Sequence, residues 1–299
     1  MAGSSSHVIQ SLAVNSAIAV AKGIAAFFTG SGAMLAEAIH SASDCINQIL
    51  LLVGIKQIQK PADEKHPLGY GRSMYFWSFI VSLMLFTGGG IFSMYEGLHK
   101  ISEPEAVENV MLGIGILAFA IILEGSATFS NIKELNIRKK QKGFFQYLKD
   151  TKDSDLVVVF GENSAAVVGL VLAIISLILS YVTGDSRWDG IGSLLVGIIL
   201  VLVAIFLGFE IKSLLLGESG DPEITDSAKK LVSKYENIQD VINIITVQQG
   251  PGEVMLAMKI KFKNISSDLL VKDINDFEKE LKILHPEIKW SFIEPDLYS

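Results

Sequence analysis

The chain has 299 residues, 50% of them hydrophobic, and its mean hydropathy is +0.44. This composition is too apolar for an ordinary soluble protein of that length, so it favours a membrane protein with a polar extension. The formal net charge of −7 and the absence of a folded basic surface argue against a nucleic-acid partner.

About six apolar stretches are long enough to cross the roughly 30 Å hydrocarbon core of a bilayer. They lie near Val8–Phe28, Ala33–Ile55, Met74–Leu98, Val110–Ile132, Leu156–Thr183 and Ile191–Leu215. Polar sequence of globular character follows the last stretch. We therefore expect an α-helical membrane protein with a six-helix transmembrane domain in residues 1–216, followed by a small cytoplasmic domain in residues 217–299.

Basic residues gather in the loops on one side of the expected membrane domain, whereas the opposite loops offer little beyond Lys100 and Arg187. The basic residues are Lys56, Lys60, Lys65, Arg72, Lys133, Arg138, Lys139, Lys140, Lys142, Lys149 and Lys152. Cytoplasmic loops carry such an excess, so both termini are predicted to be cytoplasmic, and the expected location is the plasma (inner) membrane. Residues 1–7 show no signal peptide, and the single cysteine, Cys45, excludes an internal disulfide.

The second apolar stretch carries Glu37, His40, Asp44 and Asn47 at spacings of three and four, which places them on one helix face. His40 and Asp44, one turn apart, can direct an imidazole nitrogen and a carboxylate oxygen at the same divalent ion. Glu37 extends the stripe toward a possible proton or metal path. The alternative interpretation is that these residues, with Ser41, only hydrogen-bond neighbouring helices.

The fifth apolar stretch offers a counterpart in Glu162 and Asn163. If it faces the second stretch, Asp44 and Glu162 supply two negative charges that neutralise a divalent cation away from bulk water. Glu124 lies deep in the fourth stretch and has two interpretations. It either hydrogen-bonds a neighbouring helix or belongs to the metal or proton path.

The polar extension alternates between helix and strand patterns. Asp221 is expected to cap a helix that begins at Pro222. The pattern predicts a helix to Tyr235, strands at Val241–Gln248 and Val254–Phe262, a helix at Leu269–Leu284 and a strand at Lys289–Ile293. This order of elements is typical of a small α+β sandwich with helices on one sheet face.

Two segments carry a resemblance to a known family. They are AMLAEAIHSASD at residues 33–44 and PADEKHPLGYGR at residues 61–72, and together they resemble the cation diffusion facilitators, exporters of zinc and related divalent metals. The ending FIEPD at residues 292–296 is similar to a sub-branch that includes a mitochondrial zinc transporter. The resemblance covers nearly the whole chain and implies six spans followed by a cytoplasmic α+β domain that forms dimers.

In the family, two pairs of ligands form the transport site, one on the second span and one on the fifth. By resemblance the first pair maps onto His40 and Asp44, and the second onto Glu162 and Ala166. The usual second carboxylate is thus missing at Ala166. The candidates for the fourth ligand are Asn163, Glu124 and a water molecule.

The loop at residues 61–72 resembles the second metal site of the family, with Tyr70 where a histidine often stands. Asp63 and His66 form at best a weak site there, or else the loop only fixes the helix ends. His285 is the single histidine of residues 217–299, so we expect no metal site in that domain.

We therefore expect a homodimeric secondary transporter, embedded in membrane lipid, that exports zinc or a similar divalent cation from the cytoplasm in exchange for protons. No cofactor besides the transported ion is expected, and the metal remains open among zinc, manganese, iron, cobalt and cadmium. The alternative is a non-transporting metal sensor or scaffold with the same fold. An intramembrane hydrolase is disfavoured because no nucleophile or general-base motif accompanies His40 and Asp44.

Overall fold

The computed structural model describes residues 2–139, 143–144, 147–148 and 154–296. Its contacts divide the chain into two units, Met1–Lys56 with Phe76–Lys212 and Gln57–Tyr75 with Ser213–Ser299. Four of the basic loop residues lie outside the described residues: Lys140, Lys142, Lys149 and Lys152.

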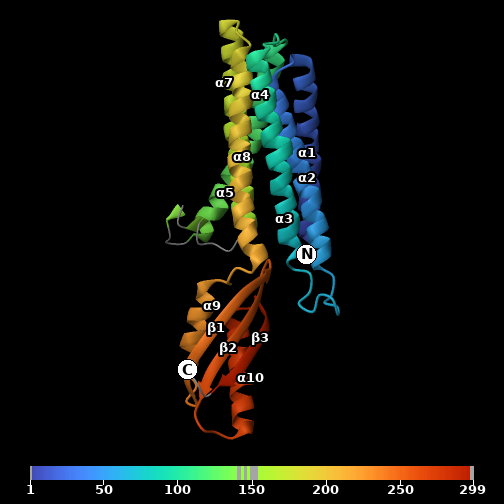
Figure 1. Cartoon of the computed structure of the whole chain (residues 1–299). Coiled ribbons are helices and arrows are strands. Elements are labelled where there is room, and N and C mark those ends of the chain that lie inside the picture. Colours follow the sequence, from blue (N-terminus) through green and yellow to red (C-terminus); the bar gives the residue numbers. More distant parts are fainter. Residues whose placement is uncertain (1, 140–142, 145–146, 149–153, 297–299) are drawn as a thin grey trace. The chain divides into compact units, whose positions relative to one another are not determined.

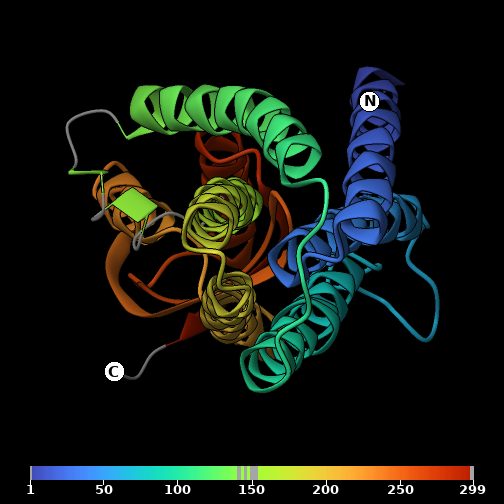
Figure 2. The same cartoon turned by 90° about the horizontal axis from the view of Figure 1, so that it is seen from above.

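The first unit is a bundle of helices (Figure 1), which Figure 2 shows from above. They are α1 (Ala2–Thr29), α2 (Gly32–Ile58), α3 (Ser73–Met84), the π-helical turn η1 (Leu85–Ile91), α4 (Phe92–Ser102), α5 (Val110–Arg138), α7 (Ser154–Thr183) and α8 (Arg187–Leu216). α3, η1 and α4 are continuous and form one span, Ser73–Ser102.

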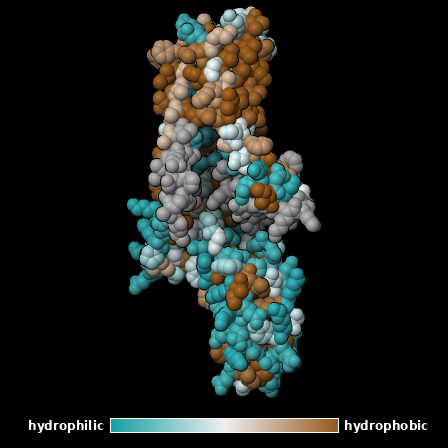
Figure 3. All heavy atoms as spheres, turned by 180° about the vertical axis from the view of Figure 1, so that it is seen from behind, coloured by the Kyte–Doolittle hydropathy of each residue, from teal (hydrophilic) through white to brown (hydrophobic). Residues whose placement is uncertain are grey.

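Within the described residues, five helices are long and apolar enough to cross a membrane. They are Gly32–Ile58, Ser73–Ser102, Val110–Ile137, Phe160–Thr183 and Arg187–Leu216, and α1 adds the shorter apolar stretch Asn15–Thr29. Hydrophobic side chains gather over this unit on the face shown in Figure 3, as expected for a surface in contact with lipid. The predicted class, apolar membrane helices followed by a small α+β domain, is confirmed.

Four helices of this unit share one apolar core. Ala25 of α1, Met34 of α2, Leu117 of α5 and Leu170 of α7 are each fully buried in it. Such tight packing fixes the faces that these helices turn toward one another. The polar stripe of α2 is therefore held against α1, α5 and α7.

The third span packs against α8 through glycines. A Cβ atom on Gly97 would lie 2.5 Å from the backbone nitrogen of Leu194 and 2.7 Å from the carbonyl oxygen of Gly190. One on Gly197 would lie 2.9 Å from the carbonyl oxygen of Gly90. Small residues thus allow the two backbones to touch, a common form of helix packing in membranes.

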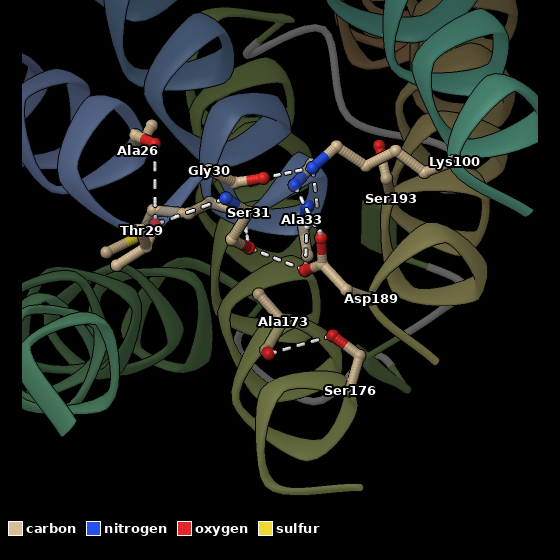
Figure 4. Close-up of polar contacts among 12 residues, drawn as sticks. Ala26, Thr29, Gly30, Ser31, Ala33, Lys100, Ala173, Ser176, Asp189 and Ser193 are labelled. Carbon is tan, nitrogen blue, oxygen red and sulfur yellow. Dashed lines mark hydrogen bonds and ion pairs between the residues drawn. The ribbon is translucent and has the colours of Figure 1, made fainter. Parts of the chain in front are cut away.

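The start of α2 is anchored by a buried carboxylate of α8 (Figure 4). Asp189 accepts hydrogen bonds from Ser31 Oγ at 2.5 Å and from the backbone nitrogen of Gly32 at 2.6 Å. Lys100 Nζ lies 3.7 Å from the same carboxylate and donates to the carbonyl oxygen of Gly30. A negative charge at a helix N-terminus satisfies free N–H groups and opposes the helix dipole, so Asp189 fixes where α2 begins.

The second unit contains α9 (Pro222–Val232), β1 (Ile238–Gly250), β2 (Glu253–Phe262), α10 (Ser267–Leu284) and β3 (Ile288–Asp296). The sheet order is β1-β2-β3, with β1 antiparallel and β3 parallel to β2. This is the predicted order of elements. The predicted cap is also present, because the Asp221 side chain accepts from the Glu223 backbone nitrogen at 2.8 Å.

The core of this unit lies between one face of the sheet and the two helices. Alternate residues of β2 are buried, among them Leu256 and Ile260. They belong to the same apolar cluster as Ala228 of α9 and Phe277 of α10. The predicted arrangement of helices on one sheet face follows from this alternation.

The loop between α2 and α3 packs on the β1–β2 hairpin within the second unit. A Cβ atom on Gly71 would lie 2.6 Å from the carbonyl oxygen of Gln249 and 3.0 Å from the Cα atom of Gly250. The two chains therefore meet backbone to backbone, which only glycines at Gly71 and Gly250 allow. This contact holds the end of the loop that carries Asp63, His66 and Tyr70.

Candidate metal site

The polar face of α2 places a buried imidazole next to a carboxylate. His40 is 1% exposed, and its Nδ1 lies 3.8 Å from Asp44 Oδ1, beyond hydrogen-bonding distance. Neither ring nitrogen has a hydrogen-bond partner among the described residues. Buried polar atoms are normally paired, so an imidazole in a membrane helix whose two nitrogens have no such partner is a candidate to bind an ion.

Glu162 comes from α7 and is held by a residue of the α2 stripe. Both of its carboxylate oxygens accept from Asn47 Nδ2, at 2.8 and 2.9 Å. These hydrogen bonds turn the polar face of α2 toward α7, and they show that Asn47 orients the Glu162 carboxylate.

The remaining expected ligands are not assembled. Among the described residues, no three side chains of His, Cys, Asp or Glu converge closely enough to hold a metal ion. Asn163 accepts a hydrogen bond from Thr128 Oγ1 at 3.2 Å through its backbone oxygen. Ala166 is a buried methyl group, 4% exposed, one turn after Glu162. The four-ligand site therefore stays a prediction.

Glu37 and Glu124 share a cation that sequence reasoning missed. Lys22 of α1 is fully buried, and its Nζ lies 3.1 Å from Glu37 Oε2 and 2.8 Å from Glu124 Oε1. It also donates to Ser41 Oγ at 2.8 Å. Both carboxylates that were predicted for a proton or metal path are therefore ion-paired. The available signal was a lysine inside an otherwise apolar stretch.

The loop that resembles a second metal site is closed by its own hydrogen bonds. Asp63 Oδ1 accepts from the His66 backbone nitrogen at 2.7 Å, and Asp63 Oδ2 accepts from the Tyr70 hydroxyl at 2.6 Å. The His66 and Tyr70 rings lie 4.3 Å apart between centroids. The Tyr70 hydroxyl, more than any other contact, lowers the pKa of Asp63, and Asp63 in turn raises the pKa of Tyr70. The Tyr70 hydroxyl therefore holds Asp63 Oδ2, an oxygen that a metal bound in this loop would need.

Comparison with known families matches residues 8–216 to the family described as cation efflux transmembrane domain. The match covers more than half of the chain and all the helices that carry the site residues. It ends at the last residue of α8.

Curated relatives extend the match into the second unit. The mitochondrial proton-coupled zinc antiporter SLC30A9 of Homo sapiens is 30% identical over 277 residues, which cover 92% of this chain and 49% of that protein. Metal tolerance protein C4 of Arabidopsis thaliana is 28% identical, covering 78% and 52%. The cation-efflux pump FieF of Klebsiella pneumoniae is 25% identical, covering 81% and 76%. The chain spans about half the length of the first of these relatives.

Proposed function

This chain belongs to the cation efflux family, whose members are transporters rather than enzymes, and we propose that it exports zinc or a similar divalent cation in exchange for protons. The names of the relatives support both parts of this proposal. One is a proton-coupled zinc antiporter and another a cation-efflux pump.

One observation carries the metal assignment: the buried and unpaired His40 ring beside Asp44 on α2. A neutral imidazole nitrogen with carboxylate oxygens suits zinc, and also manganese, iron, cobalt and cadmium. We propose that His40, Asp44 and Glu162 bind the ion when α2 and α7 close on it. Asn163, Glu124 or water completes the shell, because Ala166 brings no ligand atom.

Proton coupling follows from the same residues. Imidazole and carboxylate bind a metal only when they are deprotonated, so metal and protons compete for one site. A free imidazole titrates at about pH 6.5, which makes this competition effective near neutral pH. Alternating access then exposes the site first to the cytoplasm and next to the opposite, more acidic side, where protons displace the metal.

The membrane and the assembly are part of the proposal. The chain is an integral membrane protein. We place it in the plasma (inner) membrane with both termini in the cytoplasm. Several of its relatives are instead named as mitochondrial proteins. Residues 1–216 carry the ion, and residues 217–299 join two copies in a homodimer.

The test is metal flux into proteoliposomes that contain the purified full chain. A panel of divalent ions is offered under an imposed pH gradient, with gradient-free vesicles as the control. Uptake that depends on the gradient supports proton-coupled transport, and the ranking of ions gives the metal. Binding without flux would instead indicate the sensor or scaffold.

A further inference from the structure

The ammonium group of Lys22 is surrounded by oxygen atoms of Glu37, Ser41 and Glu124, a group of three residues here called the cage. Its three oxygen neighbours come from two other helices, Glu37 and Ser41 of α2 and Glu124 of α5, at 2.8–3.1 Å. A lysine has three donors, and each one is used here. All three oxygens therefore lie within hydrogen-bonding distance of the same nitrogen atom, Lys22 Nζ.

The cage holds more negative charge than one lysine neutralises. It contains two carboxylates and one ammonium, and Glu37 Oε1 and Glu124 Oε2 are buried without a hydrogen-bond partner in the described part of the chain. The Glu37 side chain is fully buried, and that of Glu124 is 17% exposed. Two carboxylate oxygens thus remain free to bind a cation of higher charge.

The cage adjoins the candidate transport site and uses neither His40, Asp44 nor Glu162, although Glu124 is also a candidate for the fourth ligand of that site. Glu37 precedes His40 by one helical turn, and a Cβ atom on Gly169 of α7 would collide with Glu37 Oε1. The four helices that share the membrane core therefore meet around these groups. The three oxygens would have to move inward by about half an ångström to reach the roughly 2.3–2.6 Å typical of calcium ligands.

We propose that Glu37, Ser41 and Glu124 form a second cation site in the membrane, and that Lys22 fills this site and so denies it to divalent metal. An all-oxygen site of two carboxylates and a hydroxyl would select hard ions of the manganese, calcium or magnesium class. The site itself is independent of the proposed transport. The benefit of excluding a second metal beside His40 and Asp44 rests on that proposed function.

The test counts bound Mn²⁺ in the purified full chain. Wild type and variants in detergent are dialysed against Mn²⁺, and bound metal per chain is measured by mass spectrometry. Lys22→Gln should bind one more Mn²⁺ per chain than wild type. Lys22→Arg, which keeps the cation, and the double variant Lys22→Gln/Glu37→Gln, which removes half the carboxylate charge, should match wild type. An equal count in Lys22→Gln and wild type would overturn the proposal.

Lys22→Gln leaves two buried carboxylates uncompensated and risks misfolding. The variant is therefore also purified with Mn²⁺ present throughout, and monodispersity is compared by gel filtration. Recovery by Mn²⁺ supports the cage. If Mn²⁺ gives no recovery while Lys22→Gln/Glu37→Gln folds without metal, the cage does not hold a divalent ion and the proposal is wrong.

A further variant separates the cage from the transport site. The variant Lys22→Gln/Asp44→Ala should still bind the Mn²⁺ ion that Lys22→Gln adds in the cage, because neither His40 nor Asp44 is required to hold that ion. Loss of the additional ion would mean that the two sites are one. Since this count needs no flux, a wild-type protein that fails to transport would refute the proposed function and leave the cage intact.

Discussion

Asp189, near the start of α8, accepts a 2.6 Å hydrogen bond from the backbone nitrogen of Gly32, the first residue of α2. The contact joins two helices that are 157 positions apart in the sequence. Lys100 of the third span lies against the same buried carboxylate. Three spans are thereby fixed at the start of α2, eight residues before His40.

The first prediction concerns this anchor. Asp189→Asn should destabilise the membrane unit by about 3–5 kcal/mol, because it leaves the buried Lys100 ammonium without a counter-charge. Asp185→Asn is the matched control, since Asp185 is exposed in the preceding turn. The measurement is thermal unfolding of both variants in the same detergent. Adding Lys100→Met should recover part of the loss, and an Asp189→Asn protein as stable as the control would show that the pair is dispensable.

The second prediction concerns the metal ligands on α2. Asp44→Ala should abolish metal-dependent flux and leave the folded yield unchanged, because it removes a charge that neutralises the ion. His40→Asp keeps a ligand but makes the shell entirely oxygen, so the preference should move from zinc toward manganese. Flux in proteoliposomes measures both. Normal uptake by Asp44→Ala would remove this residue from the site, and an unchanged metal ranking in His40→Asp would leave the ring as a packing group.

The third prediction concerns the missing carboxylate. If Ala166 stands at the fourth-ligand position, Ala166→Asp should tighten metal binding and slow its release. Glu162→Gln should weaken binding far more than Asn163→Ala. Isothermal titration with zinc gives each affinity. If Asn163→Ala or Glu124→Gln weakens binding as much as Glu162→Gln, that residue is the fourth ligand. A Glu162→Gln protein with full affinity would show that α7 contributes no ligand.

The architecture could be predicted because it follows from local patterns. The length and apolarity of the spans reflect the thickness of the bilayer, and the alternation in β2 reflects one buried sheet face. The Asp221 cap also depends only on neighbouring residues. The contact between Gly97 and α8 could not be predicted, since it depends on the register between two helices.

The polar partners of the candidate site could not be predicted from the sequence for the same reason. Lys22 bonds Glu37 and Glu124, which lie 15 and 102 positions away. Asn47 was placed on the correct face of α2, yet its bond to Glu162 spans 115 positions. Helical spacing indicates which side chains share a face, but the identity of the facing residue comes only from the packing of the bundle.

The fourth prediction tests the glycine contact between the third span and α8. Gly97→Val should destabilise the protein strongly, because the new Cβ atom meets the backbone of Leu194, which cannot move aside as a side chain can. Overpacking of this kind costs at least about 1–3 kcal/mol. Gly115→Val on α5 is the matched control, since a Cβ atom there meets open space. The difference in unfolding temperature in detergent measures the effect, and equal temperatures would mean that the helices can separate without cost.

The last prediction uses the loop that Tyr70 closes. The Tyr70 hydroxyl is the main cause that lowers the pKa of Asp63, so Tyr70→Phe should raise this pKa toward the free value of about 3.9. A carboxylate whose pKa is lowered by folding stabilises the loop above its unfolded pKa, and this contribution is lost as the pH falls through its folded pKa. In Tyr70→Phe the contribution should be smaller, and its loss should be complete at a higher pH than in wild type, because only the folded pKa changes.

The measurement is a carbon NMR titration of the Asp63 carboxyl carbon, labelled in the full chain. Asp221 serves as the internal reference, because it lies outside this loop. Tyr70→His gives the complementary result, since it replaces the hydroxyl by an imidazole nitrogen beside Asp63 and His66 and should raise zinc affinity in the loop. An Asp63 pKa that is identical in wild type and Tyr70→Phe would show that the hydroxyl does not hold this carboxylate, and the loop would then be open to metal without any substitution.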